Sequence, residues 1–208
     1  MSSFEKMRIS MRYWLLAKAE SDPAWLCAVK ALEYGAVRHT GTRKDGVTPE
    51  FQHQLAIMHY LRTLHVSLCY PAETLAAAAL HDVAEDTGVG FEELETQFGA
   101  RVSSGVRRVT KKHRGLVFAP EPLFAGMAEC PIASVVKGSD RINNLQTMLG
   151  VFTLEKQKAY CEETRKYFLP MLKAARRNFP EQEPVYENIK LMLNSQLALL
   201  DAAHRAAA

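Results

Sequence analysis

The chain has 208 residues, of which 48% are hydrophobic and 24% are charged, and its formal net charge is +3. This length suits a single globular domain with its own core, and the composition excludes the disordered and fibrous classes. Because the net charge is small and the basic residues are interspersed with acids, we expect no nucleic-acid partner.

Residues 1–20 mix charged and apolar residues, without an uninterrupted apolar segment or a small-residue cleavage site. We therefore predict no signal peptide, and no later segment approaches the roughly 20 apolar residues of a membrane span. The four cysteines lie far apart and form no CxxC pair, which argues against a zinc knuckle. These features predict a cytoplasmic protein without a membrane partner; the cysteines are Cys27, Cys69, Cys130 and Cys161.

Helical spacing recurs along the whole chain and strand-like alternation is scarce, which predicts an all-α fold. Helix starts are expected at residues 21–23 and at Pro71, where a proline stands beside an acidic residue or a capping residue. The segment "LAAAAL" predicts that the helix from Pro71 is buried, and we expect this helix to continue through residue 86. Short helices are expected at residues 91–98, before the stop signal of Gly99, and through residues 102–109.

Residues 112–131 contain three prolines and two glycines with weak periodicity, so we predict a long surface loop there. Helical patterns resume at residues 132–149 and 153–178, and again from Pro184 to the C-terminus. In the last of these helices an apolar stripe is expected at Ile189, Leu193 and Leu197.

The end of the alanine-rich helix carries the first chemical signal, because His81 and Asp82 are adjacent and Glu85 and Asp86 follow closely. In a continuous helix, His81 and Glu85 share one face, since helical neighbours four residues apart point the same way. Ionised carboxylates are rarely buried unless they are paired or bound to a metal, so the cluster predicts a cation. Imidazole and carboxylate ligands together suit manganese, iron, zinc or magnesium.

The remaining ligands must come from other segments, and His53 and Asp140 are the candidates. His53 lies early in an apolar helix, and Asp140 belongs to positions 136, 140, 144 and 147, which share one helix face. Each residue also has a structural interpretation: a hydrogen-bonded core histidine for His53 and a salt bridge with Arg141 for Asp140. The other histidines lack comparable neighbours and are expected to be structural or exposed: His39, His59, His65, His113 and His204.

Three motifs resemble, in order and spacing, the hydrolase domain of the RelA/SpoT family and its single-domain relatives, the small alarmone hydrolases. They are "RHTGTRKDGVTPEFQHQ", "AAALHDVAEDTGVGFEELETQFGARVSSGVRRVTKK" and "VVKGSDRINNLQTM". This group belongs to the HD superfamily of metal-dependent phosphohydrolases. The resemblance covers about residues 31–149 and implies a helical bundle of the HD type over residues 1–208, with closing helices at about 150–208.

The resemblance also implies an activity, which is the removal of pyrophosphate from the ribose 3′ position of (p)ppGpp and, as a further substrate, (p)ppApp. The implied metal is Mn²⁺, with other divalent first-row metals as alternatives, and the implied small-molecule partner is the nucleotide. The site residues follow from the motifs: the metal ligands His53, His81, Asp82 and Asp140, the water-activating pair Glu85 and Asp86, and the nucleotide contacts Arg43, Lys44, Asn144 and Thr147.

The chain departs from the family pattern at three places. Glu50 stands where relatives commonly have an aromatic residue, and Gln54 replaces a proline. Gly138 stands where relatives have leucine, and it weakens a helix by about 1 kcal/mol relative to alanine. Because relatives contact the nucleotide in the loop before the first ligand, these changes leave the choice between guanine and adenine open.

Two other functions remain open at this stage. One is an HD phosphohydrolase acting on another nucleotide, for example on the 2′-phosphate of NADPH. The other is a catalytically silent nucleotide-binding module, against which the pair Glu85 and Asp86 argues. No segment long enough for a synthetase domain follows Leu149, so hydrolysis alone is expected. Four basic residues late in the chain are interpreted as a basic wall or, more simply, a solvated face: Lys156, Lys158, Arg165 and Lys166.

Overall fold

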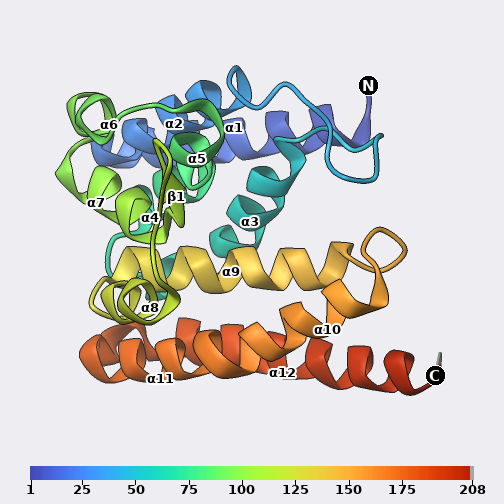
Figure 1. Cartoon of the computed structure of the whole chain (residues 1–208). Coiled ribbons are helices and arrows are strands. Elements are labelled where there is room, and N and C mark those ends of the chain that lie inside the picture. Colours follow the sequence, from blue (N-terminus) through green and yellow to red (C-terminus); the bar gives the residue numbers. More distant parts are fainter. Residues whose placement is uncertain (207–208) are drawn as a thin grey trace.

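The computed structural model describes residues 1–206, and these residues are almost entirely helical (Figure 1), which confirms the predicted all-α fold. The helices are α1 (Ser3–Ser21), α2 (Leu26–Ala36), α3 (Gln52–Thr63), α4 (Pro71–Leu80), α5 (Val83–Thr87), α6 (Phe91–Phe98), α7 (Ala100–Val109), α8 (Pro120–Ala128), α9 (Pro131–Thr147), α10 (Leu154–Glu163), α11 (Leu169–Asn178) and α12 (Glu183–Ala206). Short 3-10 turns occupy Pro23–Trp25, His65–Ser67 and Pro180–Gln182, and a π-helical turn, Thr164–Phe168, joins α10 to α11.

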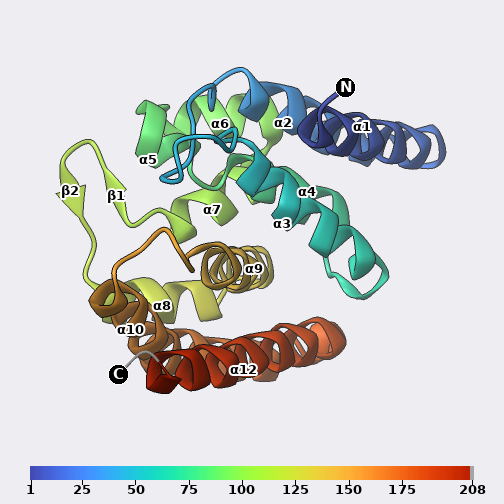
Figure 2. The same ribbon diagram turned by 90° about the vertical axis from the view of Figure 1, so that its right-hand side faces the viewer.

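Helix α9 runs through the middle of the molecule (Figures 1 and 2). On one side it packs against α3, α4 and α7, and on the other against α11 and α12. Every residue from Ile132 to Ile142 is buried, so the polar side chains within this stretch lie inside the protein. The central position of α9 therefore brings Asp140 within reach of the N-terminal motifs.

Gly138 has a packing role in this central helix. A Cβ atom at this position would lie 2.9 Å from Ile189 Cγ2 on α12 and 3.2 Å from Leu172 Cδ2 on α11. The residue that weakens α9 as an isolated helix thus permits its close contact with the C-terminal helices. The predicted apolar stripe of Ile189, Leu193 and Leu197 is buried in this contact region.

The alanine-rich helix is buried as predicted, but it ends earlier than predicted. Helix α4 stops at Leu80, and α5 begins only at Val83, so the prediction of one continuous helix through residue 86 is wrong. The Asp82 carbonyl instead accepts the amide hydrogens of Glu85 and Asp86, at 3.0 and 2.9 Å, and starts the new helix. The side chains of His81 and Asp82 consequently project from a bend between two helices.

The predicted loop at residues 112–131 contains regular structure, and that prediction is also wrong. Strands β1 (Lys112–His113) and β2 (Leu116–Val117) form an antiparallel hairpin whose turn residues, Arg114 and Gly115, both have positive φ, as a two-residue turn requires. Helix α8 follows. Its prolines, at positions 120 and 122, lie in its first turn, where the missing N–H groups have no helical partner to lose.

The other predicted helices are present. Gly99, with φ of 87°, ends α6 as expected, and the valines of α7 are buried. Asp22 caps the turn that begins at Pro23 by accepting the Ala24 amide hydrogen at 3.0 Å. The last two residues of the predicted C-terminal helix, 207 and 208, lie outside the described residues. Over residues 1–206, no helix combines the length and apolarity that crossing a membrane demands.

Candidate active site

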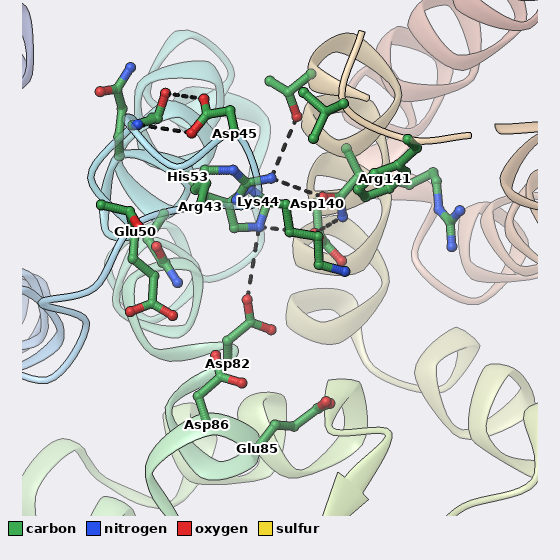
Figure 3. Close-up of a pocket in the computed structure, with 18 of the residues that line it drawn as sticks. Arg43, Lys44, Asp45, Glu50, His53, Asp82, Glu85, Asp86, Asp140 and Arg141 are labelled. Atoms are coloured by element: carbon green, nitrogen blue, oxygen red, sulfur yellow. Dashed lines mark hydrogen bonds and ion pairs between the residues drawn. The ribbon is translucent and has the colours of Figure 1, made fainter. Parts of the chain in front are cut away.

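A cavity of about 550 Å³ opens between the loop at residues 42–50, the start of α3, helix α5, and the helices α9 and α10. In Figure 3, Asp82, Glu85 and Asp86 lie on the side of α5, whereas Asp140 and Arg141 lie on α9. The predicted ligands, the acidic pair and the predicted nucleotide contacts all line this cavity, except His81, which lies directly behind Asp82.

The structure brings the four predicted metal ligands together. Donor atoms of His53, His81 and Asp82 lie within 4.8 Å of one another. Oδ2 of Asp82 is 3.1 Å from His81 Nε2 and 3.9 Å from His53 Nε2. Oδ1 of Asp140 is 3.1 Å from His53 Nε2 and 3.9 Å from His81 Nε2. Two nitrogens and two oxygens thus surround one point, although they come from three separate parts of the chain.

Both imidazole rings are oriented by hydrogen bonds on their far side. His53 Nδ1 lies 2.7 Å from the Asn143 side-chain oxygen, and His81 Nδ1 lies 2.9 Å from the Ala78 carbonyl oxygen. Because these oxygens only accept, each Nδ1 carries the hydrogen, and each Nε2 is the atom that faces the centre. This is the tautomer that a metal ligand needs.

The predicted metal ligands are mostly buried, and burial and neighbouring charges shift their pKa values in opposite directions. Burial alone would lower the pKa of His81, but the carboxylates of Asp82 and Asp140 raise it to about 9. Burial would raise the pKa of Asp140, but Lys137, whose Nζ lies 3.0 Å away, and the two histidines hold it well below its usual range. The carboxylates therefore stay ionised and attract positive charge to this point.

The residues present fit a divalent cation. His81 is 1% exposed, and its Nε2 atom has no hydrogen-bond partner in the part of the chain that the structure describes. A buried ring nitrogen without a partner, facing two ionised carboxylates, is the arrangement expected at a mixed nitrogen and oxygen metal site.

Because the chain bends at Asp82, Glu85 and Asp86 do not lie on the same helix face as His81. Figure 3 shows the Glu85 side chain directed away from Asp82 and Asp86. Its carboxylate accepts a hydrogen bond from the backbone N–H of Lys111 at the end of α7. Asp86 lies closer to the ligands: burial, together with the carboxylates of Asp82, Glu50 and Glu85, raises its pKa to about 6.

The four predicted nucleotide contacts form one edge of the cavity. Arg43 Nη2 donates to Asn144 Oδ1 at 3.4 Å and to Thr147 Oγ1 at 3.5 Å. The Lys44 ammonium lies 5.1 Å from the centre of the Phe152 ring. A tight turn fixes this loop, because the Asp45 carboxylate accepts the backbone N–H groups of Val47 and Thr48 at 3.0 and 2.9 Å.

The sequence analysis missed a basic wall formed by the buried Lys137 and Arg141 and the partly buried Lys111. Lys137 and Asp140 are three residues apart on α9, and this helical spacing is the signal that predicts their contact. Lys111 and Arg141 share the Glu163 carboxylate, with a distance of 3.1 Å from Lys111 Nζ. No spacing in the sequence predicts this second contact, since it joins three distant segments.

The four basic residues that the sequence analysis grouped late in the chain do not lie together in the structure. The Lys156 ammonium lies 4.0 Å from the centre of the Phe152 ring, at the cavity edge, whereas Arg165 pairs with Asp201 at 2.6 Å outside the cavity. Most of the other histidines are structural, as expected, since their rings contact protein oxygens: His59, His65, His113 and His204. His39, also expected to be structural or exposed, is buried beside Glu50 and Asp86.

Comparison with known proteins finds a family that part of the chain resembles. A family model described as an HD domain matches residues 31–119, which include three of the four clustered ligands. Residues 31–119 are thus similar to an HD domain. The fourth predicted ligand, Asp140, lies on α9, beyond the matched residues.

Among curated proteins, about two thirds of the chain is similar to much longer proteins. A guanosine-3′,5′-bis(diphosphate) 3′-pyrophosphohydrolase of Aquifex aeolicus is 32% identical over 148 residues, which cover 68% of this chain and 20% of that protein. A GTP pyrophosphokinase of Streptomyces coelicolor is 33% identical over 139 residues, which cover 64% of this chain and 16% of that protein. The chain thus spans about a fifth of the length of these relatives.

A solved structure has the same fold. It is described as a metazoan ortholog of SpoT that hydrolyzes ppGpp and plays a role in starvation responses. It superimposes with a TM-score of 0.60 at 23% sequence identity, covering 83% of this chain and 94% of its own. The all-α fold shared with this structure therefore extends over most of the chain.

Proposed function

We propose that the protein is a metal-dependent (p)ppGpp 3′-pyrophosphohydrolase. The observation that carries the proposal is the cluster of His53, His81, Asp82 and Asp140 within an HD domain, at the floor of a cavity with a basic wall. The names of the similar proteins support guanosine 3′,5′-bis(diphosphate) as the substrate class.

The charge distribution of the cavity suits a substrate with several phosphates. Arg43 and Lys44 stand on the loop side, and Lys137 and Arg141 stand on α9. In a partly buried cavity these charges attract phosphate oxygens more strongly than they would in bulk water. The aromatic rings of Phe152 and Tyr160 also line the cavity and provide apolar surface for a nucleobase.

In the proposed reaction, a water oxygen forms a bond to the phosphorus that is attached to the ribose 3′ oxygen. The bond between that phosphorus and the 3′ oxygen breaks, the 3′ oxygen takes up a proton, and pyrophosphate leaves. When bound, the metal ion would act as a Lewis acid, which lowers the pKa of the attacking water and offsets negative charge on the phosphate.

The side chains of the chain itself perform the remaining tasks. The Glu85 and Asp86 carboxylates line the cavity and are the candidates to accept the proton of the attacking water. Lys137 neutralises the buried Asp140, and Asn144 donates to the same carboxylate at 2.5 Å, so the ligand is held in one orientation. Positioning and electrostatic stabilisation of this kind account for most of the catalysis in phosphoryl transfer.

We further propose Mn²⁺ as the metal and the cytoplasm as the location. Two imidazoles and two carboxylates suit Mn²⁺ better than metals that prefer thiolates. Because other first-row ions bind such donors as well, the proposal is tested by comparing activity after loading the metal-free protein with Mn²⁺, Fe²⁺, Zn²⁺ or Mg²⁺.

The decisive experiment offers ppGpp, ppApp and NADPH in parallel to the Mn²⁺-loaded protein and measures pyrophosphate and orthophosphate. We expect pyrophosphate from ppGpp. The relative rate on ppApp measures the base preference that Glu50 leaves open. Pyrophosphate from neither alarmone would refute the proposal, and orthophosphate from NADPH alone would identify a different phosphohydrolase. The Asp82→Ala variant serves as the inactive control.

A further inference from the structure

A second group of metal-binding side chains lies beside the first. Donor atoms of His39, Glu50 and Asp86 all lie within 4.8 Å of one another. The His39 Nδ1 atom is 3.7 Å from Glu50 Oε1 and 3.9 Å from Asp86 Oδ2, too long for hydrogen bonds. A metal ion about 2.0–2.2 Å from each donor holds its ligand atoms roughly 3–4 Å apart. The two distances from His39 Nδ1 to the carboxylate oxygens lie within this range.

The His39 ring is buried without a hydrogen-bond partner. The residue is 3% exposed, and within residues 1–206 neither ring nitrogen finds a donor or acceptor at hydrogen-bond geometry. The ring stacks on Phe51, with centroids 6.3 Å apart and planes 16° from parallel. Leaving a buried polar group unpaired costs about 1–3 kcal/mol. A ring held in this way, with Nδ1 toward two carboxylates, has the geometry of a ligand.

The Glu50 carboxylate is fixed by its own loop. Its Oε2 atom accepts the Gly41 N–H at 3.3 Å, and the Glu50 N–H donates to the Gly41 carbonyl at 2.9 Å. This leaves Oε1 on the side of His39. Among the described residues, no lysine or arginine pairs with Glu50 or Asp86, since His39 is the sole basic group within 4.0 Å of either carboxylate. The two negative charges therefore lack a cation.

We propose that His39, Glu50 and Asp86 form a second divalent-cation site next to the first. One imidazole and two carboxylates again suit Mn²⁺, Fe²⁺ or Zn²⁺. Glu50 and Asp86 line the same cavity as Asp82, so a second ion faces the space of the substrate phosphates; this role, unlike the site itself, rests on the proposed function. The second site gives the two members of the acidic pair different roles: Asp86 is a ligand of the second ion, and Glu85 remains the proton acceptor.

The test counts bound ions without using activity. Metal-free protein is dialysed against micromolar Mn²⁺, and the bound metal per chain is measured by mass spectrometry. We expect two ions in the wild type, one in Glu50→Gln, one in Asp82→Ala, and none in the double variant. Glu50→Gln keeps an acceptor for the Gly41 N–H, so the loop is preserved. His39→Phe retains the stacking on Phe51 and is expected to bind one ion, and the exposed Glu95→Gln is the control that binds two.

The outcomes separate this inference from the proposed function. One ion in the wild type, or two ions in both Glu50→Gln and His39→Phe, overturns the second site, whether or not ppGpp is hydrolysed. Two ions in the wild type with one in each of these variants supports it, even if the protein fails to hydrolyse ppGpp. Anomalous diffraction at the manganese edge checks the same result by showing two peaks in the cavity.

Discussion

His53 and His81, the two histidines of the proposed metal site, are oriented by the Asn143 side chain and the Ala78 carbonyl group. These hydrogen bonds fix the orientation of both rings, with Nε2 toward the centre, before any ion arrives, so binding requires little movement of the side chains. The resemblance of the three motifs to the RelA/SpoT hydrolase domain predicted that His53, His81, Asp82 and Asp140 meet; the residues alone left a structural interpretation open for His53 and Asp140. Neither predicted Asn143, because an asparagine beside another asparagine on a helix gives no signal of its own.

At the scale of single residues, the first prediction concerns Glu85, which the backbone N–H of Lys111 holds in place. Glu85→Gln keeps an oxygen acceptor for that N–H but cannot take a proton. Because general acid–base catalysis contributes about 10²–10⁴-fold, we expect ppGpp turnover to fall by at least about 10²-fold. Metal content measured on the same sample should be unchanged. Loss of metal, or turnover equal to that of the exposed control Glu95→Gln, would contradict the assigned role.

A second prediction concerns two partly exposed thiols. Burial and the Glu73 carboxylate raise the pKa of Cys27 to about 11, and burial and a hydrogen bond to Glu181 raise the pKa of Cys69 to about 11. Since the thiolate is the nucleophile, a raised pKa means slow alkylation at neutral pH. We expect iodoacetamide to modify both at pH 8 roughly a hundredfold more slowly than free cysteine, on the basis of thiolate fraction.

The sign of the pH dependence follows from the same pKa values. The alkylation rate should rise about tenfold per pH unit from pH 7 to pH 10, without levelling off, whereas a free thiol of pKa about 8.5 levels off above pH 9. Peptide mass spectrometry after timed labelling measures Cys27 and Cys69 separately. A rate that levels off below pH 9 would show that these thiols titrate normally.

At the scale of elements, close helix packing depends on a glycine in α2. A Cβ atom on Gly35 would lie 2.6 Å from Phe51 Cε2 and 2.7 Å from the Ala79 carbonyl oxygen. Because a backbone carbonyl cannot move aside cheaply, we expect Gly35→Ala to lower the free energy of unfolding by about 1–3 kcal/mol. Urea denaturation measures the change, and an unaltered midpoint would contradict the prediction.

The matched control is Gly126→Ala on α8. There the nearest atom to a new Cβ is Arg108 Nη1 at 3.7 Å, which is ordinary van der Waals contact. Where a helix position has room for a Cβ atom, alanine is favoured over glycine by up to about 1 kcal/mol, so this variant should be as stable as the wild type or more stable. The same substitution thus has opposite signs at the two positions.

The sequence prediction was wrong about two elements, the end of the alanine-rich helix and the segment of residues 112–131. Periodicity predicted the existence of the helices, and glycine and proline signals predicted many of their ends. The break at His81 and Asp82 has no glycine or proline to mark it, and the Asp82 carbonyl that starts α5 gives no signal in the sequence. In residues 112–131, prolines that begin α8 were interpreted as helix breakers, since proline has both meanings in a sequence.

At the scale of the whole molecule, the proposed ion joins segments that are distant in the chain. His53 belongs to α3, His81 and Asp82 to the bend between α4 and α5, and Asp140 to the central helix α9. Without the ion, only Lys137 and the histidine rings offset the two ionised carboxylates of this mostly buried centre. Ion binding therefore stabilises the contact between the N-terminal helices and α9, on which the C-terminal helices pack.

We predict that metal removal lowers the thermal stability of the whole protein. A ligand that binds only the folded state adds about 2.7 kcal/mol at a concentration of 100 times its Kd. For a chain of this size, 1 kcal/mol shifts the melting temperature by about 2–4 °C. Saturating Mn²⁺ should thus raise the melting temperature by about 5–10 °C over the EDTA-treated protein in scanning calorimetry. The Asp82→Ala, Glu50→Gln double variant should show no rise, and an equal rise there would mean that Mn²⁺ stabilises the protein from another site.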